Sequence, residues 1–96
     1  MYVVVRDYRN EAPGGVQRAI ELQGSIKQVL AGVPGLHAYY AVDKGDGSLV
    51  TISVYADKSS AEESNRVAAS WVRDNMARWA PDPPTLIQGE VVITAP

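Results

Sequence analysis

The order in which two hydrophobic periodicities alternate is the feature of this sequence that most constrains its fold. Four segments are rich in β-branched and aromatic residues, as is typical of strands: residues 2–8, 36–42, 49–56 and 85–94. Two longer segments, residues 16–33 and 57–79, repeat their apolar residues at steps of three and four, which predicts amphipathic helices. The order β-α-β-β-α-β predicts a ferredoxin-like α+β fold, with two helices on one face of a four-stranded antiparallel sheet.

Turn-forming residues mark the boundaries between these segments. Glycine and proline interrupt the pattern at residues 10–15 and 34–35, and the stretch 43–48 is typical of a hairpin loop. At the start of the second helix, Ser59 with Glu62, or Ser60 with Glu63, fits a capping box. The prolines in residues 81–84 end this helix, because proline lacks the N–H donor. A chain of 96 residues is expected to form a single domain spanning residues 1–96.

Composition argues against several classes of function. Nine Lys and Arg against eleven Asp and Glu leave a net charge of −2, whereas nucleic-acid-binding modules usually carry a basic patch. The absence of cysteine and the single histidine leave little material for a metal site, and we expect neither a metal nor a cofactor. No apolar run approaches the roughly 20 residues of a membrane span, and no signal peptide is visible. We therefore expect a soluble, cytoplasmic protein with no nucleic-acid or membrane partner.

The central hairpin predicts how side chains divide between the two faces of the sheet. Pairing Val42 with Val50 gathers the apolar residues on one face, because side chains alternate along a strand. We expect that apolar face to lie under the helices, while the facing of the last strand stays open. The other face, left uncovered, is predicted to carry four of the five tyrosines and the only histidine, with His37 opposite Tyr55: Tyr2, Arg6, Tyr8, His37, Tyr39, Thr51, Ser53 and Tyr55.

A face of this composition is too aromatic for solvent and too polar for a sealed core, so something is expected to cover it. Single-stranded nucleic acid is disfavoured, because the face offers Arg6 and little other positive charge. A small chain buries a limited share of its surface alone, which favours self-association. The sequence therefore predicts a homodimer through the open sheet face, enclosing a cavity lined by these polar and aromatic groups.

Several stretches of the sequence carry a family resemblance: residues 35–40, the Asp46-Gly47 turn, residues 60–66 and 71–73, and residues 89–91. Through them the whole chain resembles the dimeric α/β-barrel superfamily, in particular its antibiotic-biosynthesis-monooxygenase-like group of small uncharacterised bacterial proteins. The resemblance implies homodimerisation. Some members oxidise phenolic or quinol substrates with O₂ and no cofactor, whereas others degrade haem with a histidine on a helix. Here the only histidine lies on a predicted strand, which argues against haem degradation.

Most of the candidate site residues follow from the predicted open face, whereas Asn65 and Trp71 lie on the stripe of the second predicted helix. His37 is the candidate proton acceptor, Tyr55 is its predicted neighbour, and Arg6 suits a substrate carboxylate or quinone oxygen. Five further residues are candidates for binding a small aromatic compound: Tyr8, Tyr39, Ser53, Asn65 and Trp71. Each also has a structural interpretation, as interface packing, salt bridge or core. Two functions stay open, a cofactor-independent monooxygenase and a non-catalytic ligand-binding or interaction module. An enzyme predicts a cavity of roughly 300 Å³ or more with converging polar groups.

Overall fold

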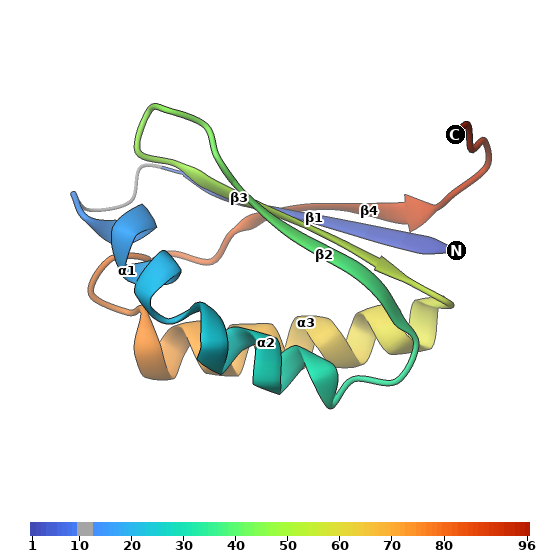
Figure 1. Ribbon diagram of the computed structural model, residues 1–96, viewed down its shortest axis with the longest axis horizontal. Helices are drawn as coiled ribbons and strands as arrows, with labels where there is room; N and C mark the ends of the chain where they lie inside the picture. Colours follow the sequence, from blue (N-terminus) through green and yellow to red (C-terminus); the bar gives the residue numbers. More distant parts are fainter. Residues whose placement is uncertain (10–12) are drawn as a thin grey trace.

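A sheet covered on one face by helices makes up the computed structural model of the chain, which describes residues 1–9 and 13–96 (Figure 1). The elements along the chain are β1 (Tyr2–Tyr8), α1 (Gly15–Glu21), α2 (Gln23–Ala31), β2 (Leu36–Asp43), β3 (Leu49–Tyr55), α3 (Lys58–Asn75) and β4 (Thr85–Glu90). The strands are antiparallel in the order β2-β3-β1-β4. The predicted ferredoxin-like α+β fold is confirmed. Residues 10–12, part of the predicted turn after β1, lie outside the described residues.

The first predicted helix is two helices in the structure. Leu22 lies between α1 and α2 with φ −95° and ψ 9°, outside the helical region. Its side chain packs against a core cluster formed by Tyr8, Met76 and Ala80. Gly24 and Ser25, both poor helix formers, follow directly. The break leaves α1 at one end of the sheet, while α2 runs beneath it (Figure 1).

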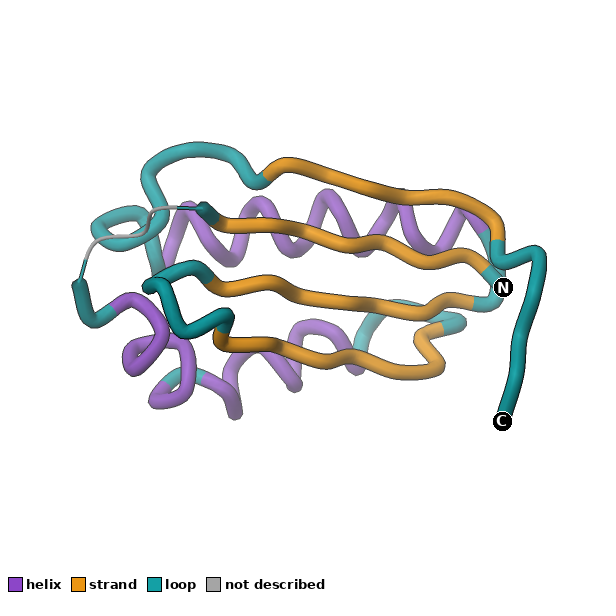
Figure 2. The backbone as a smooth tube through the Cα atoms, turned by 90° about the horizontal axis from the view of Figure 1, so that it is seen from above, coloured by secondary structure: helices purple, strands orange, loops and turns teal. Residues whose placement is uncertain are grey.

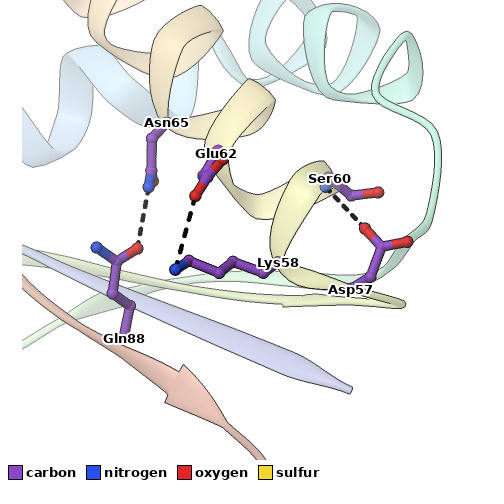
Figure 3. Close-up of polar contacts among 6 residues, drawn as sticks. All are labelled: Asp57, Lys58, Ser60, Glu62, Asn65 and Gln88. Atoms are coloured by element: carbon purple, nitrogen blue, oxygen red, sulfur yellow. Dashed lines mark hydrogen bonds and ion pairs between the residues drawn. The ribbon is translucent and has the colours of Figure 1, made fainter.

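The third helix begins at a different cap from the one predicted. The carboxylate of Asp57 accepts a hydrogen bond from the backbone N–H of Ser60 at 2.8 Å, so Asp57 is the N-cap and the predicted capping box is wrong (Figure 3). This hydrogen bond lowers the pKa of Asp57. The helix ends at Asn75, before Trp79, and the chain turns through Met76 toward the prolines.

The hairpin register is confirmed over most of its length. Val42 lies opposite Val50, and Tyr39 lies opposite Ser53. The register shifts between Leu36 and Ala38, so that Leu36 lies opposite Tyr55. The predicted pairing of His37 with Tyr55 is therefore wrong, because the strand accommodates one extra residue here.

The predicted assignment of the two faces is also wrong, because the helices cover the tyrosine-rich face. On β1 and β3, the residues buried under the helices are Val4, Arg6, Tyr8, Thr51, Ser53 and Tyr55. Val4 and Tyr55 form a core cluster with Val33 and Ala61 from the helical layer. The strand registers place the apolar set on the opposite, open face: Val3, Val5, Ala38, Tyr40, Val42, Val50, Ile52, Val54 and Ile87.

The physical reason for this arrangement lies in the inner surface of α3. The residues that α3 buries against the sheet are Ala61, Ser64 and Ala68, which are small or carry a hydroxyl. Buried polar side chains need hydrogen-bond partners, and Ser64 supplies them to polar groups of the sheet. The tyrosine-rich face therefore fits under α3 better than the apolar face does.

The open face leaves apolar side chains exposed. Tyr40 is 59% exposed and Ile87 is 68% exposed. Beyond β4, the backbone N–H of Val91 donates to the carbonyl of Met1 at 2.8 Å, and the chain then runs past the strand ends with Val92 and Ile93 exposed (Figure 2). Among residues 1–9 and 13–96, no helix has the length and apolar character needed to cross a bilayer.

Gly35 is a glycine whose position leaves no room for a side chain. Its φ is +81°, and an added Cβ would lie 2.7 Å from Oγ of Ser60. We expect Gly35→Ala to lower the free energy of unfolding by about 1 kcal/mol more than Gly45→Ala does, measured by urea denaturation. Gly45 is the matched control, because its φ is +85° but nothing lies within 4 Å of an added Cβ. Equal losses in both variants would show that crowding at Ser60 is unimportant.

Candidate functional site

A cavity of about 340 Å³ lies between the helix-covered face of the sheet and the helices. Apolar side chains such as Leu30, Val72 and Met76 make up much of its wall. Polar and aromatic side chains complete it: Arg6, Tyr8, Tyr39, Thr51 and Trp71. Its volume is in the range predicted for a ligand site. Its position differs from the prediction, because it lies within one chain rather than on the open face.

Arg6 projects from the middle of β1 into the space between sheet and α3, and only 3% of the residue is exposed. Its Nη1 donates to Oγ of Ser53 at 3.2 Å. Its Nη2 donates to Oγ of Ser64 at 3.4 Å and to Oδ1 of Asn65 at 2.6 Å. The guanidinium thus joins β1, β3 and α3 through three neutral acceptors.

Asn65 is itself held in one orientation by β4. Its Nδ2 donates to Oε1 of Gln88 at 3.1 Å, while its Oδ1 accepts from Arg6 (Figure 3). Turning the Asn65 amide around would set donor against donor at Arg6 and acceptor against acceptor at Gln88. Gln88 therefore keeps the Asn65 carbonyl directed at the guanidinium.

Tyr55 and Ser53 are supporting residues in the structure. Both are fully buried, and the hydroxyls of Tyr55 and Ser64 share a short hydrogen bond. Neither residue is part of the cavity wall. Ser53 accepts a hydrogen bond from Arg6, and Tyr55 is hydrogen-bonded to Ser64, which also accepts from Arg6. Both residues therefore help to position Arg6 without lining the cavity.

Tyr39 presents a phenol to the cavity from β2. Burial raises the pKa of Tyr39 to about 12, the neighbouring Tyr8 and Tyr55 add to the rise, and Arg6 opposes it. The Tyr39 hydroxyl is therefore protonated at neutral pH. In that form it can donate a hydrogen bond to an oxygen of a bound molecule.

Trp71 and Tyr8 supply the aromatic part of the wall. The Nε1 of Trp71 donates to Oγ of Ser25 at 2.9 Å, which fixes the indole between α3 and α2. Tyr8 also lines a second hollow of about 360 Å³, between α3, β4 and residues 80–84. Arg6 lines both hollows, and Asn65 lines the second. Arg6 is thus one of the residues that the two walls share.

His37 is the candidate that the structure separates from the others. It is exposed, lies at the irregularity of β2, and is absent from the walls of both hollows. The structure thus brings Arg6, Tyr8, Tyr39 and Trp71 together around one cavity. It leaves His37 outside.

Three residues of the site escaped prediction as site residues, namely Ser64, Gln88 and Thr51. Ser64 had a signal in the sequence, because it occupies a buried position between two alanines on the inner face of α3. Thr51 shares the predicted tyrosine-rich face with Arg6, but no role was predicted for it. Gln88 had no signal, since the facing of the last strand follows only from its pairing with β1. Within the described residues, no group of three or more His, Asp or Glu is placed to hold a metal ion.

Comparison with known proteins supports the fold. No protein-family model and no curated protein matches the sequence. A protein of unknown function from Nitrosomonas europaea superposes with a TM-score of 0.75 at 19% identity, over 98% of this chain and 90% of that one. A monooxygenase from Streptomyces coelicolor, solved in complex with nanaomycin D, superposes with a TM-score of 0.71 at 14% identity, over 97% and 92%.

A further solved structure, an antibiotic biosynthesis monooxygenase, superposes with a TM-score of 0.72 at 18% identity, over 97% of this chain and all of the other. These likenesses extend over nearly the whole chain. The predicted resemblance to antibiotic-biosynthesis-monooxygenase-like proteins is confirmed as a resemblance of fold.

The shifted pKa of Tyr39 predicts a pH dependence of stability. A phenol whose pKa rises from about 10 to about 12 on folding stabilises the fold fully below pH 10 and loses that contribution between pH 10 and 12. We expect the free energy of unfolding to fall more steeply with pH above 10 in the wild type than in Tyr39→Phe, by urea denaturation. A wild-type slope in Tyr39→Phe would contradict the assignment.

Proposed function

We propose that this chain binds a small aromatic or phenolic compound in the cavity beneath the helices and oxidises it with O₂ without a cofactor. The observation that supports this most directly is the cavity itself, in which aromatic side chains surround a few convergent polar groups. The likeness in fold to monooxygenases, one of them solved with nanaomycin D, supports the same chemistry.

The proposed reaction balances with O₂ as the only co-reactant. A phenol such as 1-naphthol loses its hydroxyl proton and one ring hydrogen, and gains one oxygen atom to become the 1,4-quinone. The second oxygen atom leaves as water. The protein needs to bind the ring, hold its oxygen and exclude bulk water, and Tyr39 and Trp71 are the proposed contacts for these tasks.

A non-catalytic ligand-binding module is the second candidate. The observation that favours it is the position of His37, which lies outside both hollows. The cavity wall within the described residues thus lacks the proton acceptor that the sequence predicted. This module would bind the same class of compound through the same wall but would consume no O₂.

Oxygen consumption with 1-naphthol as the substrate tests the proposed function. When the reaction runs under ¹⁸O₂, we expect mass spectrometry to find one ¹⁸O atom in the quinone product. Ala41→Trp places an indole in the cavity wall. It should reduce the rate by about tenfold or more, because the indole would occupy the space of the substrate ring. Ala31→Trp, at the exposed end of α2 and outside both hollows, is the matched control.

The outcomes separate the two candidates. Binding of 1-naphthol without oxygen uptake would favour the ligand-binding module. A rate unchanged by Ala41→Trp would show that the chemistry takes place elsewhere.

We further propose that the open sheet face is covered by a second copy of the chain. The face carries apolar side chains from all four strands, with Tyr40 and Ile87 among its exposed residues. Exposed apolar patches of this kind mark interaction surfaces, and a two-fold axis lets one such face meet another.

Light scattering during size-exclusion chromatography tests the dimer. We expect the wild type to elute with twice the 10.3 kDa mass of one chain, and Ile87→Lys to shift toward the single-chain mass, because a charge would be buried in the interface. Ile20→Lys, which alters an isoleucine 51% exposed on α1, is the control and should stay dimeric. A wild-type protein of single-chain mass would remove the proposed dimer.

A further inference from the structure

The guanidinium of Arg6 is a buried cation whose hydrogen-bond partners carry no charge. Its three acceptors are the hydroxyls of Ser53 and Ser64 and the amide oxygen of Asn65. Among the described residues, no ion pair includes Arg6. A charge taken out of water is costly unless an opposite charge compensates it, so a compensating anion would be strongly favoured here.

Neither the Asp7 carboxylate nor the Asp43 carboxylate forms an ion pair with Arg6. Asp7, the next residue along β1, points to the opposite face of the sheet, and its Oδ2 lies 3.8 Å from Nζ of Lys44. Asp43 lines the cavity, but it is exposed and its Oδ1 accepts from the backbone N–H of Gly45 at 2.8 Å. Lys27, also exposed, adds a second positive charge to the wall. The deep part of the cavity therefore keeps an uncompensated positive charge.

A hydroxyl group beside Arg6 lacks a hydrogen-bond partner. Thr51 lies directly opposite Arg6 on β3, and only 5% of the residue is exposed. Its Oγ1 is buried, and within the described structure it makes no hydrogen bond. Thr51 lines the same cavity as Arg6. Leaving a buried hydroxyl unpaired costs about 1–3 kcal/mol, which a ligand oxygen at this position would offset.

We propose that the cavity takes its aromatic ligand as an anion, with an ionised oxygen on the ring system held by Arg6 and Thr51. This inference rests on the proposed function, which places an aromatic compound in the cavity. The new part is that the bound compound is negatively charged. The ionised oxygen belongs either to a carboxylate or to a phenolate. In both, a charge-assisted hydrogen bond from the guanidinium replaces the missing counter-ion, and the Thr51 hydroxyl donates to the same oxygen.

Isothermal titration calorimetry of the full chain with a matched pair of probes tests the proposal. The probes are 2-naphthoate and 2-naphthamide, which share a shape but differ in charge. We expect 2-naphthoate to bind about tenfold more tightly or better. Thr51→Val keeps the shape of the side chain and should weaken 2-naphthoate several-fold with little effect on 2-naphthamide.

Arg6→Met should bring the ratio of the two affinities close to one. Arg66→Met is the matched control, because Arg66 lies exposed on α3 beside Glu63, and it should keep the wild-type ratio. If Arg6→Met fails to fold, the wild-type ratio and Thr51→Val still decide the outcome.

A third probe distinguishes the two sources of the anion. 2-Naphthol that binds with the absorption spectrum of its ionised form would identify a phenolate site. 2-Naphthol that binds weakly and un-ionised beside tight 2-naphthoate would identify a carboxylate site. Equal affinities for 2-naphthoate and 2-naphthamide would overturn the anion preference and leave the aromatic cavity standing. Failure of all three probes to bind would overturn both proposals.

Discussion

The hydrogen bonds of one buried guanidinium connect the sheet to its longest helix. Arg6 on β1 reaches Ser53 on β3 and both Ser64 and Asn65 on α3. Small residues along the inner face of α3 leave room for this charged side chain, which a stripe of large apolar residues would exclude. Packing of the sheet against α3 and the chemistry of the cavity wall therefore depend on the same atoms.

Much of the fold could be predicted from the sequence, because strand and helix periodicities differ clearly and one hairpin register gives a clean apolar face. Which face of the sheet lies under the helices could not be predicted in the same way. The rule that apolar side chains face the helices assumes an apolar helix stripe, and Ser64 in the stripe of α3 was the sign that the rule fails here. The irregularity at His37 had no local signal, since neither glycine nor proline marks it within the strand.

The candidate site was predicted in part for the same reason. Arg6, Tyr8 and Tyr39 were grouped correctly, because alternation along the strands does not depend on which face the helices cover. Trp71 comes from the helical stripe and meets them only because the faces are reversed. Reversing the faces also moves these polar groups from the predicted interface to a cavity between the sheet and the helices. The surface left for the proposed second copy is then largely apolar, as the buried centre of a homodimer interface usually is.

The proposed second role of Arg6, binding an anion, would tie folding stability to occupancy of the cavity. Its buried charge is solvated by two hydroxyls and one amide oxygen, so it carries a desolvation cost that the proposed anionic ligand would offset. Ligand binding and thermal stability are then linked quantities, so the tighter binding proposed for the anion would raise the melting temperature more than the weaker binding of an uncharged analogue at the same concentration. Replacements that relieve the buried charge by making this position apolar would favour the fold at the expense of the site. This is the trade-off expected wherever a functional group is also a structural one.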